Sequence, residues 1–318
     1  MKEIIFLNPV YKDYIWGGTK LKTYFNKQVT FEKTAESWEI STNKNGKSII
    51  KNGEHEGKEL DELFNNMQIR EEIFGTKTLN LDRFPLLVKF IDANDNLSVQ
   101  VHPNDEYAKE KENDIGKTEM WYILECGENA QVICGLKDNV QQEDVETIIK
   151  GGKIKENLKY ISIKKGDAIY IPAGTIHALL GDTLLCEIQQ NSDLTYRVYD
   201  WDRIGKDGQP RQLHIEKAID VINVNNSPKI IETKNIKEEI VRIVDSNYFK
   251  TDKITIKESF VQKSNEETFY AVNVIKGEGI IKVREKEYKI KLGDSFIIPA
   301  TVGEYTIQGE LEILESYI

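Results

Sequence analysis

The sequence is poor in cysteine. Its three cysteines, Cys126, Cys134 and Cys186, are odd in number, and none belongs to a C-x-x-C pair. A disulfide framework and a cysteine-ligated zinc site are therefore not expected. We expect the three thiols to be small buried groups in the reducing environment of the cytoplasm.

Long apolar runs and nucleotide-binding fingerprints are also missing. No stretch approaches the roughly 20 apolar residues of a membrane span. The N-terminal segment has no apolar region followed by a small-residue cleavage site, so a signal peptide is not expected. Neither a P-loop nor a Gly-rich strand-to-helix motif occurs, which leaves the nucleotide-binding α/β folds without support.

Positive charge is in deficit, because the formal net charge is −10 at pH 7. This balance disfavours nucleic acid and anionic membranes as partners. It also means that an anionic small molecule would need a local cluster of Lys and Arg to bind.

What the chain does contain is many short runs rich in Val, Ile, Tyr and Phe, separated by turn residues. Such runs predict strands, and their number predicts a mainly β protein, a sandwich or barrel with a few short helices. A length of 318 residues favours two or so domains. The clearest expected strands lie at 86–92, 97–102, 120–125, 130–135, 159–163 and 168–172, and the expected helices at 61–75, 142–152 and 214–224.

An internal repeat links two parts of the chain. Residues 165–189 match residues 292–316, and residues 121–128 match 271–278. The match predicts two copies of one β-barrel unit, with chance similarity of strand-turn-strand sequence as the alternative. The aligned motifs are Gly166-Asp167 with Gly293-Asp294, and Ile171-Pro172-Ala173 with Ile298-Pro299-Ala300.

Two of the four histidines, His102 and His177, lie where a strand begins or ends. Alternation places Gln100 and His102 on the polar side of their strand, and His177 follows a strand and a turn. Glu119 begins the next apolar run. Alone, each residue is more often a surface or hydrogen-bonded core residue, but together they fit a borderline metal such as zinc.

The second copy of the repeat lacks these groups. By the sequence match, Phe269 stands where the first copy has Glu119, and Glu304 stands where it has His177. One functional unit and one without ligands is the simplest interpretation. The other two histidines, His55 and His214, are expected to be structural.

Several ordered motifs resemble the type I mannose-6-phosphate isomerases, in their shorter bacterial form. The resemblance covers most of the chain and implies the cupin fold, interconversion of mannose 6-phosphate and fructose 6-phosphate, and one zinc ion per chain. The motifs are NPVYKDYIWGGTKL near the N-terminus, AESWEIS (35–41), QVHPND (100–105), KTE (117–119), AGTIHAL (173–179), NSDLTYRVYD (191–200) and HIEKAIDVI (214–222).

Transferred residue by residue, the resemblance implies that Gln100, His102, Glu119 and His177 bind the metal. Gln100 offers only a neutral amide oxygen and could instead orient a metal-bound water. The family's catalytic Arg falls on Arg197. Its Lys two residues before the Glu ligand falls on Lys117, although Thr118 departs from the KPE of longer members.

The two catalytic candidates have structural alternatives. Arg197 could form a strand-end ion pair, because Asp193, Asp200 and Asp202 are close in sequence, and Lys117 could be a solvated lysine in a charged stretch. If catalytic, Arg197 would stabilise an oxyanion or hold the phosphate. Lys117 would bind phosphate or carry a proton.

The resemblance and the repeat together predict two domains. We expect a catalytic, metal-binding cupin domain with helical insertions over residues 1–235, a connection near 225–245, and a degenerate cupin domain without metal ligands over 240–318. Two other functions remain open: a non-catalytic sugar-binding or regulatory protein with two such units, and a metal-dependent cupin oxygenase. The oligomeric state is also left open.

Overall fold

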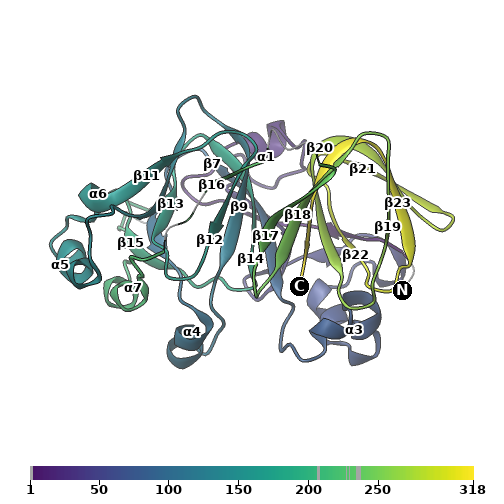
Figure 1. The fold of residues 1–318 in the computed structure, drawn as a ribbon, viewed down its shortest axis with the longest axis horizontal. Helices are drawn as coiled ribbons and strands as arrows, with labels where there is room; N and C mark the ends of the chain where they lie inside the picture. The colour runs from purple at the N-terminus through teal and green to yellow at the C-terminus, as the bar shows by residue number, and fades with distance from the viewer. Residues whose placement is uncertain (1–2, 206–207, 227, 229, 234–237) are drawn as a thin grey trace.

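Three sheets lie side by side in the computed structural model, which describes residues 3–205, 208–226, 228, 230–233 and 238–318 (Figure 1). A five-stranded sheet forms the left part of the view, a seven-stranded sheet the middle, and a nine-stranded sheet the right. The expected mainly β chain with a few short helices is confirmed.

The seven-stranded sheet is covered on both faces. In β9, Met120 and Leu124 contribute to the core on the side of the nine-stranded sheet, while Trp121 and Ile123 face the five-stranded sheet. Apolar residues at almost every position explain why this strand reads as a continuous hydrophobic run. The order is β16 (Ile230–Glu232), β12 (Asp167–Ile171), β9 (Glu119–Cys126), β14 (Thr183–Gln190), β7 (Leu86–Ala93), β3 (Glu36–Ile40) and β2 (Val10–Lys12).

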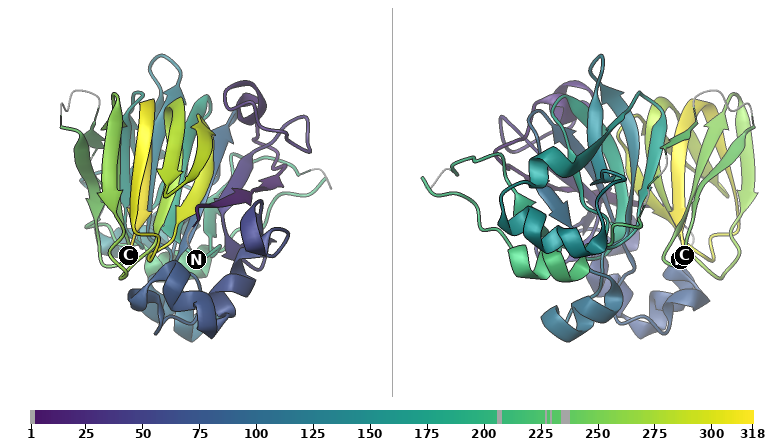
Figure 2. Two further views of the ribbon diagram at one scale, coloured as in Figure 1. Left: turned by 90° about the vertical axis from the view of Figure 1, so that its right-hand side faces the viewer. Right: turned by 60° about the vertical axis from the view of Figure 1, so that its left-hand side comes forward.

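The five-stranded sheet faces the middle sheet across an apolar core. Val132, Cys134 and Leu179 of this sheet pack with Trp121 and Ile169 of its neighbour. A second core covers its outer face, where α5 and α7 lie (Figure 2). The strand order is β11 (Leu158–Ser162), β10 (Gln131–Leu136), β13 (His177–Leu179), β8 (Val99–Val101) and β15 (Tyr196–Tyr199).

The nine-stranded sheet combines the C-terminal quarter of the chain with two short N-terminal strands. Ile5 pairs with Ile297, so the start of the chain joins this sheet. Its central path is β17 (Ile240–Asp245), β18 (Lys250–Ile256), β23 (Glu304–Tyr317), β20 (Tyr270–Val283), β22 (Ser295–Ile298), β1 (Ile5–Asn8) and β6 (Ile49–Ile50), with β19 (Ser259–Lys263) on β23 and β21 (Lys286–Lys291) on β20. A small separate hairpin is formed by β4 (Thr42–Asn43) and β5 (Gly46–Lys47).

The expected helical segments are helical, although the first is split into α2 and α3. The helix α4 was not expected, because its sequence is highly charged and only Ala108 is buried. Its start is marked by Asn104, whose side chain accepts a hydrogen bond from the Tyr107 amide. The helices are α1 (Lys20–Thr23), α2 (Leu60–Asn65), α3 (Met67–Phe74), α4 (Asp105–Glu112), α5 (Val145–Lys150), α6 (Ile154–Asn157) and α7 (Ile215–Val221).

Two closed barrels are not confirmed. Within the described part of the chain, no sheet returns to its first strand, and the N-terminal region consists of two sheets facing each other. The division into domains near 235–240 stays a prediction, and residues 234–237 of the expected connection lie outside the described residues.

None of the helices in the described segments is long and apolar enough to cross a membrane.

Candidate metal centre

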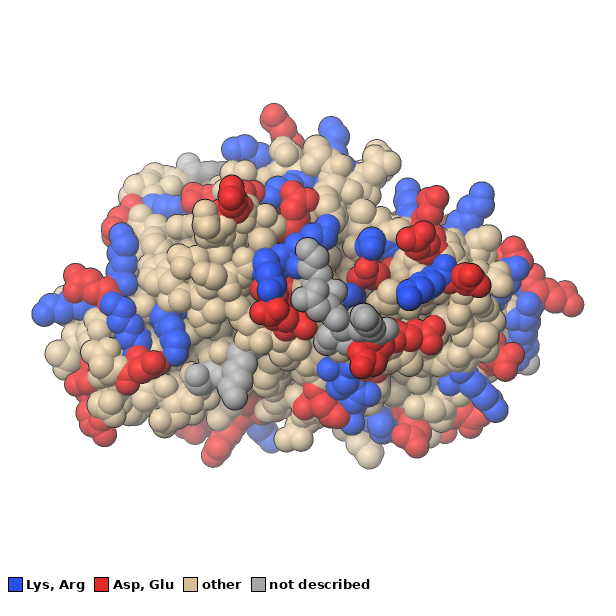
Figure 3. All heavy atoms as spheres, turned by 45° about the horizontal axis from the view of Figure 1, so that its top comes forward, with Lys and Arg blue, Asp and Glu red and all other residues tan. Residues whose placement is uncertain are grey.

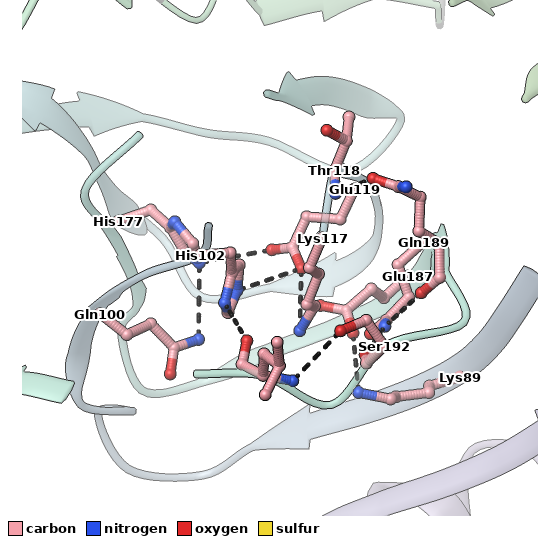
Figure 4. Close-up of polar contacts among 12 residues, drawn as sticks. Lys89, Gln100, His102, Lys117, Thr118, Glu119, His177, Glu187, Gln189 and Ser192 are labelled. Carbon is pink, nitrogen blue, oxygen red and sulfur yellow. Dashed lines mark hydrogen bonds and ion pairs between the residues drawn. The ribbon is translucent and has the colours of Figure 1, made fainter. Parts of the chain in front are cut away.

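The candidate ligands meet at one end of the space between the five- and seven-stranded sheets. His177 begins β13 and Glu119 begins β9, while Gln100 lies in β8 and His102 directly follows it. Figure 4 shows His102, Glu119 and His177 pointing toward one another. Apolar side chains such as Trp121 and Ile171 pack in other parts of this space.

The three side chains are close and fully enclosed. One ligand atom from each of His102, Glu119 and His177 lies within 4.8 Å of the others. Nε2 of His102 is 3.5 Å from Oε2 of Glu119, and Nε2 of His177 is 3.4 Å from Oε1 of the same carboxylate. All three residues are at most 1% exposed.

Both histidines are held with Nε2 directed into the centre. Nδ1 of His102 is 2.8 Å from the carbonyl oxygen of Leu194, and Nδ1 of His177 is 2.8 Å from that of Thr175. A carbonyl oxygen can only accept, so each Nδ1 carries the proton and each Nε2 has a free lone pair. Burial lowers the pKa of His102 to about 3 and also lowers the pKa of His177, which keeps both rings neutral.

Glu119 is ionised despite its burial. Desolvation alone would raise its pKa, but the Lys117 ammonium beside it holds the pKa well below its ordinary value. Nζ of Lys117 lies 3.1 Å from Oε2 of Glu119, and the lysine is 4% exposed. The alternative of a solvated Lys117 is therefore wrong.

The polar atoms at the centre fit a bound cation. Nε2 of His102 and both carboxylate oxygens of Glu119 are buried and have no hydrogen-bond partner. Buried polar groups without partners are rare in folded proteins and need an explanation. Two imidazole lone pairs facing a carboxylate repel one another unless a positive ion lies between them, and N and O donors of this type suit zinc.

Gln100 lies beside the three residues, but its amide nitrogen rather than its amide oxygen faces His177. Its Nε2 is 3.4 Å from Nε2 of His177, while its Oε1 is 3.5 Å from the hydroxyl of Ser98. Rotation of the amide by half a turn would bring Oε1 toward His177. Its assignment as a ligand stays a prediction.

The turn before His177 is fixed by Gly174. Its φ is +84°, and a Cβ there would lie 2.9 Å from the carbonyl oxygen of Val221. The Gly174 amide donates to the carbonyl oxygen of His102 (2.8 Å), which ties the two histidine segments together. Thr118 adds a further link, because its hydroxyl accepts from the Ala173 amide and its own amide donates to Gln190.

A cavity of about 260 Å³ extends from Gln100 and Lys117 to Arg197. Arg197 lies in β15, where Nε donates to Ser98 Oγ (3.2 Å) and Nη1 to the carbonyl oxygen of Gln212 (3.0 Å). Among the described residues, no carboxylate lies within ion-pair distance of Arg197, so the strand-end ion pair is not formed. A larger cavity of about 420 Å³ lies elsewhere and is lined by none of the candidate ligands or catalytic residues.

Sequence reasoning missed a buried charge cluster in the same cavity. Nζ of Lys89 lies 3.0 Å from Glu187 and 3.7 Å from Glu36, and all three residues line the cavity. Trp38 and Trp121 donate through their indole N–H groups to Glu36 (2.6 Å) and Glu187 (3.0 Å). The available signal was a charged residue inside each of these largely apolar strands.

The remaining histidines separate into two cases. His55 lies in a partly exposed 3-10 turn. His214 caps α7 and lies beside Arg197, because its Nδ1 accepts from the Arg197 amide (3.2 Å) and its own amide donates to the Arg197 carbonyl (2.8 Å). It is therefore structural, as expected, but it supports a site residue.

Two family models match the chain. The model for the phosphomannose isomerase type I catalytic domain matches residues 4–132, and the model for the mannose-6-phosphate isomerase cupin domain matches residues 239–318. Among curated proteins, a probable mannose-6-phosphate isomerase of Bacillus subtilis (strain 168), GmuF, is 44% identical over 100% of both chains. The mannose-6-phosphate isomerase ManA of the same organism is 39% identical over 99% of both.

Solved structures agree with the sequence matches. The crystal structure of the mannose 6-phosphate isomerase from Bacillus subtilis has a TM-score of 0.91 and 39% identity, with 99% of each chain covered. A phosphomannose isomerase from Salmonella typhimurium has a TM-score of 0.78 over 99% of each chain at 16% identity, which shows a shared fold. Sequence and structure together place this chain in the type I mannose-6-phosphate isomerase family of cupin enzymes.

Proposed function

We propose that the protein interconverts mannose 6-phosphate and fructose 6-phosphate, using one zinc ion per chain. The observation that carries this proposal is the buried group of His102, Glu119 and His177, in which Nε2 of His102 and both Glu119 oxygens accept no hydrogen bond, beside a cavity that also holds Lys117 and Arg197. Relatives at 38–44% identity over the whole chain carry the name of this activity, which supports the substrate assignment.

The zinc ligands would be His102, Glu119 and His177, with Gln100 as a fourth. Two neutral imidazoles and one carboxylate leave a formal positive charge on the centre when zinc is present, which favours an anionic intermediate. Zinc bound there supplies Lewis acidity that orients and polarises the two substrate oxygens. The hydrogen bonds from Nδ1 of each histidine hold the rings in place for this task.

The remaining chemistry falls to residues of the cavity wall. Isomerisation moves a proton between C1 and C2 through an enediol-type intermediate, so it needs a group that stabilises negative charge and a group that carries the proton. Arg197, which contacts only neutral groups, supplies positive charge to the substrate. Lys117 lies next to Glu119 and is placed to donate to a substrate oxygen or to carry the proton.

Lys89 is less suited to accept a proton. Burial alone would lower its pKa, but Glu187 and Glu36 hold the pKa above its ordinary value, so the ammonium stays charged. A fixed cation of this kind donates hydrogen bonds to substrate hydroxyls. Its two carboxylates and the two tryptophans that bind them keep it in one position.

One other function is favoured by a specific observation. Two histidines and one carboxylate also form the iron site of many oxygenases, and the donor set here matches that pattern. Elemental analysis combined with an oxygen-consumption assay separates this function from the isomerase.

The decisive experiment is an assay of the purified, zinc-loaded protein with mannose 6-phosphate, in which fructose 6-phosphate is measured. We expect turnover that is lost when a chelator removes the metal and restored when zinc returns. No turnover in a folded sample that contains metal would exclude the isomerase. Binding of the sugar phosphate without turnover would instead indicate a sugar-binding protein.

A further inference from the structure

The chain must select an anionic substrate although its own net charge is −10. The surface gives no general solution, because Lys and Arg are intermixed with Asp and Glu over the face shown in Figure 3. Recognition of a phosphate group therefore depends on which cations inside the cavity are left without a compensating carboxylate.

Among the described residues, four cations line the cavity, and two of them have a carboxylate at contact distance. Lys89 is paired with Glu187 (3.0 Å), and Lys117 is paired with Glu119 (3.1 Å). Both ammonium groups are almost completely buried beside these carboxylates. The lysines therefore balance the charge of the site and add little net attraction for a dianion.

The other two cations, Arg197 and Arg211, line the same cavity and affect each other. Burial and the neighbouring Arg211 both lower the pKa of Arg197, as expected for two guanidinium groups close together. Within the described part of the chain, Arg197 donates to two neutral oxygens, those of Ser98 and Gln212. Its charge is thus available to a ligand.

Arg211 is held in place by Asp200. Its Nε donates to Oδ2 of Asp200 (2.7 Å), and its Nη2 donates to Oδ1 of the same carboxylate. Arg203 shares this carboxylate through Nη2 (2.6 Å), and its Nη1 also lies 3.8 Å from Oδ2 of Asp95. Asp200 is 6% exposed, and the two arginines hold its pKa below the ordinary value, although burial alone would raise it.

We propose that Arg211, together with Arg197, binds the phosphate group of the substrate, and that Asp200 positions Arg211 for this role. Two guanidinium groups line the same cavity, and Asp200, the carboxylate that binds Arg211, is shared with Arg203, so Arg211 is only partly compensated by Asp200. The planar fork of arginine suits phosphate oxygens, and Asp200 restricts the side chain before the ligand arrives. This inference rests on the proposed function, because it assigns the phosphate of a sugar phosphate to one end of the same cavity.

The test uses Arg211→Gln in the zinc-loaded protein and mannitol 1-phosphate, a reduced hexose phosphate that cannot isomerise. We expect calorimetry to show binding at least about tenfold weaker than in the wild type, since a charged hydrogen bond to the ligand is lost. The Michaelis constant for mannose 6-phosphate should rise by a similar factor, with kcat within about threefold. Unchanged binding of mannitol 1-phosphate would overturn the proposal.

Arg203→Gln is the matched control. It removes the other partner of Asp200 but leaves the cavity wall intact, because Arg203 does not line the cavity. We expect mannitol 1-phosphate affinity to stay within about twofold of the wild type. If Arg203→Gln weakens binding as much as Arg211→Gln, both arginines only stabilise the segment around Asp200, and the proposal is wrong.

Two further measurements separate the possible failures. Arg211→Lys keeps the charge and loses the fork, so an intermediate loss of affinity is expected even if Arg211→Gln does not fold. Unphosphorylated mannitol should bind the wild type and both Arg211 variants equally weakly. A wild type that binds mannitol 1-phosphate through Arg211 without turning over mannose 6-phosphate would refute the isomerase while leaving the phosphate site standing.

Discussion

The N-terminal region and the C-terminal sheet are built on the same strand order. The path β12-β9-β14-β7 in the seven-stranded sheet corresponds to β22-β20-β23-β18 in the nine-stranded sheet. The two regions differ in continuity. In the C-terminal sheet β20 and β23 each run for 14 residues, whereas the matching segments of the N-terminal region are interrupted as β9 and β10, and as β13 and β14. The interruptions separate two sheets, and the candidate metal centre lies in the space between them.

Equivalent positions in the two regions carry different chemistry. Glu119 pairs with Ile171, and the residue that pairs with the matching Ile298 is Tyr270. The sequence match had aligned Glu119 with Phe269, one residue earlier, and a shift of one residue moves a side chain to the other face of a strand. Likewise His177 lies opposite Gln100, whereas Glu304 lies opposite Lys263. A shared scaffold thus holds ligands in one region and none of them in the other.

The sharpest test of this difference compares His177→Ala with Glu304→Ala, the same change at corresponding strand starts. The first variant should lose its bound metal and its activity, because it removes one of three buried ligands. The second should keep both, since Glu304 is exposed. Elemental analysis and the isomerase assay measure the result, and a His177 variant with full metal would refute the ligand assignment.

Phe269 tests what the C-terminal region contributes instead of ligands. Its ring is completely buried and packs against Phe84 (4.9 Å between centroids) and Phe74 (5.8 Å) in the core between the two regions. Phe269→Ala should lower the free energy of unfolding by about 3–5 kcal/mol. Denaturant unfolding measures this loss.

The control for Phe269 is Val261→Ala in β19 of the C-terminal sheet, where the side chain is exposed. It should change the free energy of unfolding by less than about 0.5 kcal/mol. Equal effects at the two positions would mean that the core between the regions is not what stabilises the protein.

Arg197→Ala separates chemistry from metal binding within the N-terminal region. The variant should retain the metal, because Arg197 contacts Ser98 and Gln212 rather than the three buried ligands. Its rate should fall by about 10²–10³-fold if the guanidinium stabilises negative charge in the transition state. Metal content and catalytic rate are measured on the same sample. A variant that retains both the metal and the full rate would show that Arg197 is structural.

Local pattern predicted much of this molecule, and long-range pairing accounts for the rest. The strands β7 and β9 were foreseen because both of their faces are apolar, and alternation placed Gln100 and His102 on one side of theirs. The contact between Lys89 and Glu187 joins residues 98 positions apart, and no local signal specifies it. Lys117 was ambiguous for the same reason, since only the fold shows that its charged segment turns inward to Glu119.

The smallest expected effect concerns a second buried glutamate, Glu315, in the C-terminal sheet. Glu119 has Lys117 as a neighbour and a lowered pKa, whereas Glu315 contacts the neutral side chains of Gln262 (3.1 Å) and Tyr305 (3.2 Å). Burial raises the pKa of Glu315 to about 7. The folded state therefore holds this proton more tightly than the unfolded chain, whose value is near 4.5.

The sign of the pH dependence follows from this shift. As pH rises from 4.5 to 7 the unfolded chain loses the proton first, so the contribution of Glu315 to stability falls, and it levels off above pH 7. Between pH 5 and pH 8 the wild type should lose about 2 kcal/mol relative to Glu315→Gln, which cannot titrate. Urea unfolding of both proteins across this range gives the difference. Parallel curves of unfolding free energy against pH would mean that Glu315 lies in a more polar environment than its burial indicates. Glu119 and Glu315 would then differ only in whether they bind a metal.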